Sequence, residues 1–327
     1  MRAVTCRRYG PPECLRIEDM PRPTPAGREV RVRVRATTVT SGDARIRGFR
    51  CPPIFWLPLR LALGLRRPRR PVPGMEFAGV VDAIGDDVTR FRPGDPVFGI
   101  GLSGANAEWL TIREDRAIAP MPAGLSHAEA AAIPFGALAA LAFLRDVAAV
   151  RPGERVLVVG AAGGVGVFAV QLARHFGAEV TAVCGAANLD LVRSLGATSV
   201  IDRARRDFTT EATRFDIILD TIGVTDPRRC RRVLTARGRH VFLSFGFAEM
   251  CHALASRLRP GPRVTSGFSG NDPGDLELLR DMAEARTLRP VIGLTMPIEA
   301  VVAAHRHVDG GRKRGSLVLT LGDGSGA

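Results

Sequence analysis

The sequence contains no closely spaced pair of cysteines. None of its six cysteines belongs to a CxxC pair, the spacing from which cysteine-built zinc sites and many redox motifs are made. The pattern therefore predicts reduced structural thiols and excludes a metal site built from cysteine. The six residues are Cys6, Cys14, Cys51, Cys184, Cys230 and Cys251.

Lysine is nearly absent. Lys313 is the only lysine, although Lys and Arg together number 46 and the net charge is +13. A positive charge of this size suggests nucleic-acid binding as a hypothesis. The almost exclusive use of arginine indicates a compositional bias, and no nucleic-acid-binding motif accompanies it. We therefore do not expect a nucleic acid as the partner, although an RNA-binding protein stays as an alternative.

The sequence also lacks a convincing membrane span. Residues 156–173 carry no charge, but the four glycines at their centre disfavour one continuous helix. A second uncharged stretch, residues 130–144, is too short to span and contains Pro134 and Gly136. The N-terminus has no apolar segment of the kind found in secretion signals. We predict a cytoplasmic protein with no membrane span.

The uncharged segment instead has the pattern of a strand, a glycine turn and a helix. Residues 156–159 are valine and leucine, as in a buried strand of a parallel sheet, and a helix follows from Gly166. A second strand spans residues 179–183. Free N–H groups at such a turn can bind a pyrophosphate, whereas a tight structural turn is the alternative. The candidate cofactor-binding residues are Gly163, Gly164, Val165 and Gly166.

Two patterns divide the chain. Up to about residue 121 short strand signals dominate, such as the alternation of Arg and Val in residues 29–35, and they predict an all-β module. From residue 122 onward helices and strands alternate, after a capping box of Ser126 and Glu129. This alternation predicts a doubly wound parallel sheet. The fold class is therefore α/β, a β-rich domain plus a Rossmann domain.

The motifs in their order resemble the medium-chain dehydrogenase/reductase superfamily, specifically its zinc-free quinone oxidoreductase-like (zeta-crystallin-like) branch. They cover nearly the whole chain and include GMEFAGVVDAIGDDVTRFRPGDPVFG, VRPGERVLVVGAAGGVGVFAVQLARHFGAEVTAV, FDIILDTIG and KRGSLVLTL. The resemblance implies a GroES-like catalytic domain, residues 1–121 and 272–327, and a Rossmann domain, residues 122–271. It also implies a cofactor cleft where the domains meet, hydride transfer with NADPH, and a homodimer.

The resemblance further implies where zinc would bind. Zinc-dependent relatives carry Cys and His in the segments that here read TTVTSGD and GMEF, near Thr40 and Met75. Neither side chain can replace a thiolate or an imidazole as a zinc ligand, so we expect no zinc ion in this protein. The candidate catalytic residues are Thr40, Asp43 and Arg45, polar groups near the expected hydride site that can orient a carbonyl or relay a proton. Pairing of Asp43 with Arg45 is the alternative.

The end of the second Rossmann strand bears on the choice of cofactor. NAD enzymes usually carry Asp or Glu there, whereas this chain has no carboxylate from Cys184 to Asn188. We therefore predict NADPH over NADH, with Cys184 and Asn188 beside the cofactor. Arg203 is a candidate to bind the 2′-phosphate bidentately, or is one more surface arginine. Ser244 and Gly246 are expected near the nicotinamide end.

The substrate class follows from the absence of zinc. Hydrogen bonds alone must polarise the substrate, which suits quinones and enones better than simple alcohols. Enoyl-thioester reductases of the superfamily use a tyrosine where this chain has Phe49 and Arg50, which disfavours thioester reduction. We predict a zinc-independent NADPH-dependent reductase of quinones or α,β-unsaturated carbonyls. An alcohol dehydrogenase or carbonyl reductase, and a non-catalytic cofactor- or RNA-binding member of the family, are the alternatives.

One segment stays without an assigned role. Residues 51–71, CPPIFWLPLRLALGLRRPRRP, join an apolar, aromatic stretch to a dense cluster of arginines. A lid or pocket wall over a substrate, a plain surface excursion, and contact with a membrane surface or a nucleic acid all fit this composition.

Overall fold

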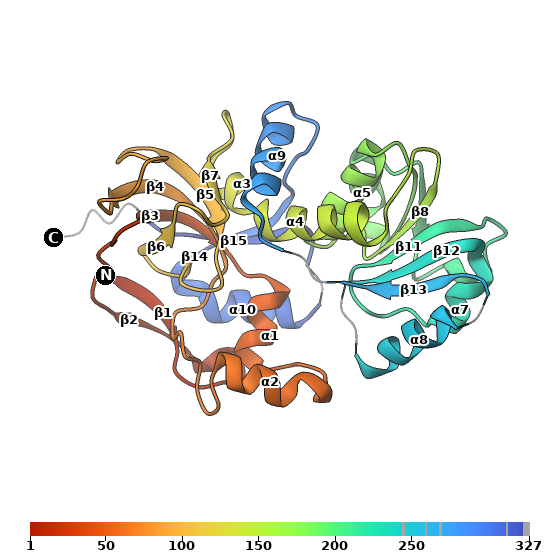
Figure 1. The fold of residues 1–327 in the computed structure, drawn as a ribbon, viewed down its shortest axis with the longest axis horizontal. Coiled ribbons are helices and arrows are strands. Elements are labelled where there is room, and N and C mark those ends of the chain that lie inside the picture. The colour runs from red at the N-terminus through yellow and green to blue at the C-terminus, as the bar shows by residue number, and fades with distance from the viewer. Residues whose placement is uncertain (244–245, 259, 268–269, 312, 323–327) are drawn as a thin grey trace. The chain divides into compact units, whose positions relative to one another are not determined.

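Two large sheets organise the chain, one in each of two units. The structure is a computed structural model that describes residues 1–243, 246–258, 260–267, 270–311 and 313–322. Unit 1 comprises Met1–Phe135 and Asn271–Ala327, and unit 2 comprises Gly136–Gly270 (Figure 1). The sequence prediction drew the domain limits at 121/122 and 271/272.

The sheet of unit 2 is doubly wound. Its strand order is β10-β9-β8-β11-β12-β13 with every pair parallel, which confirms the predicted Rossmann architecture. The strand order reverses beside β8, the point at which such sheets bind ligands. The elements are β8 (Arg155–Val159), α5 (Gly166–His175), β9 (Glu179–Cys184), α6 (Leu189–Ser194), β10 (Ser199–Asp202), β11 (Phe215–Asp220), α7 (Pro227–Cys230), β12 (Leu234–Phe242), α8 (Phe247–Arg257) and β13 (Arg263–Ser266).

The glycine turn between β8 and α5 depends on close backbone contact. Gly160 has φ +78°, a conformation that favours glycine. A Cβ on Gly166 would lie 2.2 Å from the carbonyl oxygen of Gly160, closer than any side chain tolerates. Gly166 therefore has a packing role at the start of α5.

Gly166→Ala is expected to destabilise the protein. The added methyl group forces the turn and α5 apart, and overpacking of this kind costs about 1–3 kcal/mol. Gly185→Ala is the matched control, because Gly185 has φ −82° and a Cβ there meets nothing within 4 Å. Urea unfolding of the three proteins measures the effect. Equal midpoints for both variants would refute the packing role of Gly166.

Unit 1 contains a seven-stranded sheet built from both ends of the chain. The order is β14-β15-β3-β4-β5-β7, and β6 pairs with β3. A two-stranded sheet of β1 and β2 lies apart from this path. The strands are β1 (Arg2–Cys6), β2 (Leu15–Asp19), β3 (Glu29–Thr38), β4 (Glu76–Ile84), β5 (Pro96–Ile100), β6 (Trp109–Arg113), β7 (Ile118–Pro120), β14 (Ile292–Pro297) and β15 (Ser316–Thr320).

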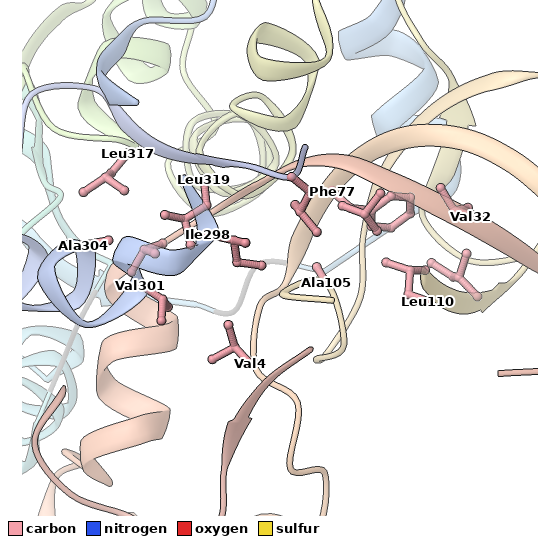
Figure 2. Close-up of a cluster of buried hydrophobic side chains, with 14 of the residues drawn as sticks. Val4, Val32, Phe77, Ala105, Leu110, Ile298, Val301, Ala304, Leu317 and Leu319 are labelled. Atoms are coloured by element: carbon pink, nitrogen blue, oxygen red, sulfur yellow. The ribbon is translucent and has the colours of Figure 1, made fainter. Parts of the chain in front are cut away.

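Strand β3 shows the predicted alternation. From Val30 to Val34 its valines are buried and its arginines are half-buried, as a period-two pattern requires. The core of unit 1 joins these valines to side chains from the C-terminal part of the chain. Figure 2 shows Val32, Phe77 and Leu110 in the same cluster as Ala304 and Leu319. The two chain ends therefore share one hydrophobic core.

The prediction of an all-β module before residue 122 is wrong, because two helices follow β3. Helix α1 (Ser41–Gly48) begins at a capping box in which Thr40 accepts from the N–H of Asp43. Helix α2 (Pro53–Leu63) begins at a proline, which favours the first position of a helix. Thr40 and Asp43, predicted as catalytic residues, therefore also form the signal that starts α1.

The remaining α-helices of the described residues are α3 (His127–Ala131), α4 (Pro134–Ala142), α9 (Pro273–Glu284) and α10 (Val301–Asp309). Three of them, α3, α9 and α10, pack on strands of unit 1, and α4 runs across the limit between the two units in the sequence. The predicted capping box of Ser126 and Glu129 is present at the start of α3. The 21-residue helical stretch from His127 to Val147 is long and apolar enough to cross a membrane, but most of it is buried within the protein, as expected of a core helix.

The fold brings together two cysteines that the sequence leaves apart. The sulfur atoms of Cys6 and Cys14 lie 3.8 Å from each other, and both thiols are buried. Burial raises the pKa of Cys6 to about 12, and the neighbouring Cys14 adds to this shift. A thiol with this pKa stays protonated at neutral pH and is a poor nucleophile.

Candidate functional site

Unit 2 has a cavity of about 410 Å³ at the carboxyl ends of its parallel strands. Gly160, which follows β8, and Cys184, which ends β9, line the cavity. Residues 203–209 and residues after β11 complete its lining. The carboxyl edge of a doubly wound sheet, at the point where strand order reverses, is where such folds bind ligands. The position of the cavity therefore fits a nucleotide.

The turn beside this cavity offers free backbone donors. The N–H of Gly163 bonds to the carbonyl of Gly160 at 3.0 Å. For Gly164, Val165 and Gly166, no hydrogen bond joins the N–H to another residue in the described ranges. These three groups stand at the N-terminus of α5, where the helix dipole favours an anion. The residues present fit the pyrophosphate of a dinucleotide.

Four arginines line the same cavity, and they differ in what they already bind. Arg206 pairs with Glu211 at 2.7 Å, Arg229 pairs with Asp207, and Arg205 lies 3.7 Å from Asp202. The guanidinium of the fourth, Arg203, has no ion-pair or hydrogen-bond partner in the part of the chain that the structure describes. Its side chain is the one left to bind an anion.

The backbone holds Arg203 next to the end of β9. Its N–H donates to the carbonyl of Cys184 at 2.9 Å, so the structure brings together these two predicted cofactor residues. Asn188 ends the short helical turn after β9 and does not line the cavity. Gly246 precedes α8, where its N–H donates to Glu249 at 2.7 Å. Ser244 lies outside the described residues.

Unit 1 places the predicted catalytic segment between β3 and α1. Asp43 is buried, and its carboxylate accepts from both the N–H and the hydroxyl of Thr40, at 2.8 Å and 2.6 Å. Burial raises the pKa of Asp43, whereas the bonds from Thr40 lower it. Arg45 is exposed, and no pair joins it to Asp43 in the described structure. The alternative in which Asp43 and Arg45 bind each other is therefore not observed.

Glu76, the first residue of β4, is a second buried carboxylate. One oxygen accepts from the N–H of Phe135 at 2.7 Å, and the other accepts from the hydroxyl of Thr38. Burial raises the pKa of Glu76 to about 7, although both hydrogen bonds act to lower it. Glu76 is thus poised to change charge near neutral pH.

Lys313, the only lysine of the chain, lies near these two carboxylates. The ammonium of Lys313 donates to the carbonyl of Val39 at 3.0 Å, between Thr38 and Thr40. Burial lowers the pKa of Lys313, and the negative charges of Glu76 and Asp43 oppose that shift. The structure therefore joins one cation and two carboxylates at the end of β3. Sequence reasoning missed Lys313, and its rarity among 46 basic residues was the available signal.

The residues at this place do not fit zinc. The hydroxyl of Thr40 already donates to the carboxylate of Asp43. The side chain of Met75 packs against α1, because its terminal methyl group would lie 2.6 Å from a Cβ placed on Gly42. A hydroxyl and a thioether are poor zinc ligands, and the lysine already supplies a positive charge. In the described ranges, no three residues among His, Cys, Asp and Glu are grouped to hold a metal ion.

The raised pKa of Glu76 predicts a pH-dependent stability. Because the folded-state pKa of about 7 exceeds the ordinary value, Glu76 stabilises the fold fully below about pH 4.5 and loses that contribution as pH rises through 7. Relative to Glu76→Gln, the wild type should lose roughly 3 kcal/mol of unfolding free energy over this range. Urea unfolding of both proteins at several pH values measures it. A constant difference between them would contradict the buried titration.

Two families match parts of the chain. The alcohol dehydrogenase GroES-like domain family matches residues 26–123, and the zinc-binding dehydrogenase family matches residues 195–319. The first match lies in unit 1, and the second covers parts of both units.

Several curated proteins are similar over most of the chain. Pikromycin polyketide synthase component PikAII of Streptomyces venezuelae is 33% identical over 92% of this chain, which spans only 8% of that much longer protein. NAD(P)H oxidoreductase RTN4IP1, mitochondrial, of Bos taurus is 30% identical, with 76% of this chain and 70% of the relative covered. Quinone oxidoreductase of Mus musculus is 28% identical, with 98% of each chain covered.

Solved structures share the whole fold. The quinone oxidoreductase from Coxiella burnetii has a TM-score of 0.86 and 26% identity, with 98% of this chain and 99% of that chain covered. The CurK enoyl reductase has a TM-score of 0.85 and 25% identity over the same shares.

Proposed function

Because this chain belongs to the quinone oxidoreductase-like branch of the medium-chain dehydrogenase/reductase superfamily, we propose that it is an NADPH-dependent reductase of quinones or α,β-unsaturated carbonyl compounds. The observation that carries the choice of cofactor is Arg203, an unpaired guanidinium at a cavity beside a β9 end that has no carboxylate. When bound, NADPH supplies a hydride to the substrate.

In unit 2 the chain's own groups bind and orient the cofactor. The N–H groups of Gly164, Val165 and Gly166, at the N-terminus of α5, would hold the pyrophosphate. Arg203 would bind the 2′-phosphate with its planar fork of N–H groups. Cys184 is buried at the end of β9 and leaves the space that a ribose-binding carboxylate occupies in NAD enzymes.

In unit 1 the same proposal gives Lys313 the role of proton donor. Burial lowers the pKa of the Lys313 ammonium, which makes it a better proton donor, whereas an arginine keeps its proton. The carbonyl of Val39 holds the ammonium beside Thr40, and the negative charges of Glu76 and Asp43 favour its charged form. Thr40 fixes Asp43 and thereby positions this cluster. Among the described residues, no hydrogen bond or ion pair of the Arg45 side chain supports a catalytic role, so its role stays a prediction.

A turnover assay tests the function. The purified chain is mixed with NADPH or NADH and either a benzoquinone, a cyclic enone, or a saturated aldehyde, and nicotinamide absorbance is followed. The proposal expects NADPH oxidation with the quinone or the enone and slower oxidation with NADH. Turnover of the aldehyde alone would favour a carbonyl reductase, and no turnover with any acceptor would favour a non-catalytic cofactor-binding protein.

Reduction of an enoyl thioester is a second candidate, favoured by the likeness to the CurK enoyl reductase. Against it, Phe49 stands where related reductases carry a tyrosine, and its ring packs against Tyr9 with centroids 4.9 Å apart. The hydroxyl of Tyr9 is occupied, since it donates to the carbonyl of Gly64 at 3.0 Å. Crotonyl-coenzyme A in the same assay decides between them, because faster turnover than with the quinone would make the thioester the preferred substrate.

A homodimer and a cytoplasmic location complete the proposal. The dimer rests on the resemblance to the family alone, and the location is proposed from the composition of the chain. Light scattering after size exclusion measures the oligomeric state, and a monomer at micromolar concentration would overturn the dimer.

A further inference from the structure

Helix α2 presents an apolar face to solvent. Ile54, Leu57 and Leu61 are 46%, 57% and 53% exposed, and their spacing of three and four residues places them on one side of the helix. No residue of α2 is buried. An exposed helix normally turns polar residues outward, so a continuous apolar face marks an interaction surface.

The opposite side of α2 holds the helix in this orientation. Arg60, its only charged residue, places its guanidinium 3.9 Å from the centre of the Phe49 ring and 4.5 Å from that of Tyr9. The Trp56 ring meets Phe49 edge-on at 6.1 Å. These contacts fix the polar side of α2 against unit 1 and leave the leucines facing outward.

A cluster of exposed arginines follows directly. Leu65 is exposed, and residues 66–70, which follow it, include four exposed arginines. No carboxylate pairs with any of the four in the part of the chain that the structure describes. The apolar face and an uncompensated positive charge are therefore adjacent. The arginines are Arg66, Arg67, Arg69 and Arg70.

We propose that α2 and the four arginines dock this protein on the surface of a membrane rich in anionic lipids. An apolar helical face enters the boundary between headgroups and acyl chains, and each nearby arginine adds about 1 kcal/mol of attraction to anionic headgroups. The helix has 11 residues, too few to cross a bilayer, so it lies on the surface.

Other occupants fit this surface less well. RNA would bind the arginines, but the aliphatic leucines offer no stacking surface for bases. A second copy of this chain related by a twofold axis would bring two clusters of arginines together, which repel each other. The charge favours an anionic partner, and the apolar face favours a lipid. This inference does not depend on the proposed enzymatic function.

Vesicle co-sedimentation tests the proposal with the full chain. Vesicles of equal parts phosphatidylglycerol and phosphatidylcholine should bind the wild type, and vesicles of phosphatidylcholine alone should bind at least tenfold more weakly. Leu57→Glu with Leu61→Glu should abolish binding, and Arg66→Gln with Arg67→Gln should weaken it roughly tenfold or more. All four positions are exposed, so the variants are expected to fold, which circular dichroism checks.

Matched controls separate docking from general charge. Leu278→Glu changes a leucine on α9 that is 43% exposed, and Arg237→Gln removes an exposed arginine of unit 2. Both controls should bind vesicles like the wild type. Absence of vesicle binding, equal binding to neutral vesicles, or equal loss in the controls would overturn the proposal. A dimer in solution that Leu57→Glu dissociates would also overturn it, because α2 would then bind a second copy. So would a protein that binds RNA but no vesicles and whose RNA binding Leu57→Glu leaves intact.

Discussion

Replacing Lys313 by methionine is expected to lower turnover of a quinone by about 10²–10⁴-fold, the usual contribution of a positioned general acid. The ammonium group is held at the end of β3 by Val39 and by the charges of Glu76 and Asp43. Methionine keeps the length of the side chain and removes the proton. Steady-state kinetics with NADPH and a benzoquinone measures the loss.

The arginine variant makes this test more specific. Lys313→Arg keeps the positive charge but cannot release a proton at neutral pH, so a proton-donor role predicts a loss close to that of Lys313→Met. Arg314→Gln changes the exposed neighbour and should leave turnover unchanged. Full activity of Lys313→Arg would show that the charge alone matters. NADPH affinity, measured separately, should be the same in all of these proteins.

Replacing Arg203 by glutamine is expected to weaken NADPH binding by roughly 10- to 100-fold while NADH binding stays unchanged. Hydrogen bonds to a charged group contribute about 1.5–3 kcal/mol, which corresponds to this range. The other cavity arginines already have carboxylate partners, so they cannot fully replace Arg203. Calorimetric titration with each cofactor measures both affinities.

A control arginine separates the 2′-phosphate from general charge. Arg237→Gln removes an exposed guanidinium of unit 2 that does not line the cavity, and it should leave the affinity for NADPH unchanged. An equal loss for NADPH and NADH in Arg203→Gln would contradict a specific role at the 2′-phosphate. An unchanged affinity for NADPH would show that Arg203 is a surface arginine that does not contact the cofactor.

The parts of the fold that the sequence predicts are those with a local pattern. The strand, glycine turn and helix around Gly166 follow from uncharged β-branched residues and glycines within one short segment, and the structure confirms them. The alternation in β3 likewise follows from its own residues. Helix α1 was missed because Thr40 and Asp43 satisfy a capping box and a catalytic hypothesis equally well.

The carboxylate–lysine cluster could not be predicted locally. Lys313 and Val39 are 274 positions apart, and they meet because β15 pairs with β3, with Val318 opposite Thr38. Nothing near Lys313 in the sequence indicates a carboxylate partner. Arg203 differs, because its neighbours Arg205 and Arg206 pair with carboxylates close to them in the sequence, and the sequence already indicated Arg203 as a candidate. Long-range pairing therefore decides the chemistry that local patterns leave open.

The most direct test of the account is amide hydrogen exchange across residues 160–168 with and without NADPH. The central claim is that the free N–H groups of Gly164, Val165 and Gly166 bind the pyrophosphate. Exchange at these three amides should slow when NADPH is added, while the already bonded N–H of Gly163 should change less. NADPH binding that leaves exchange at the turn unchanged, or no binding at all, would contradict the claim.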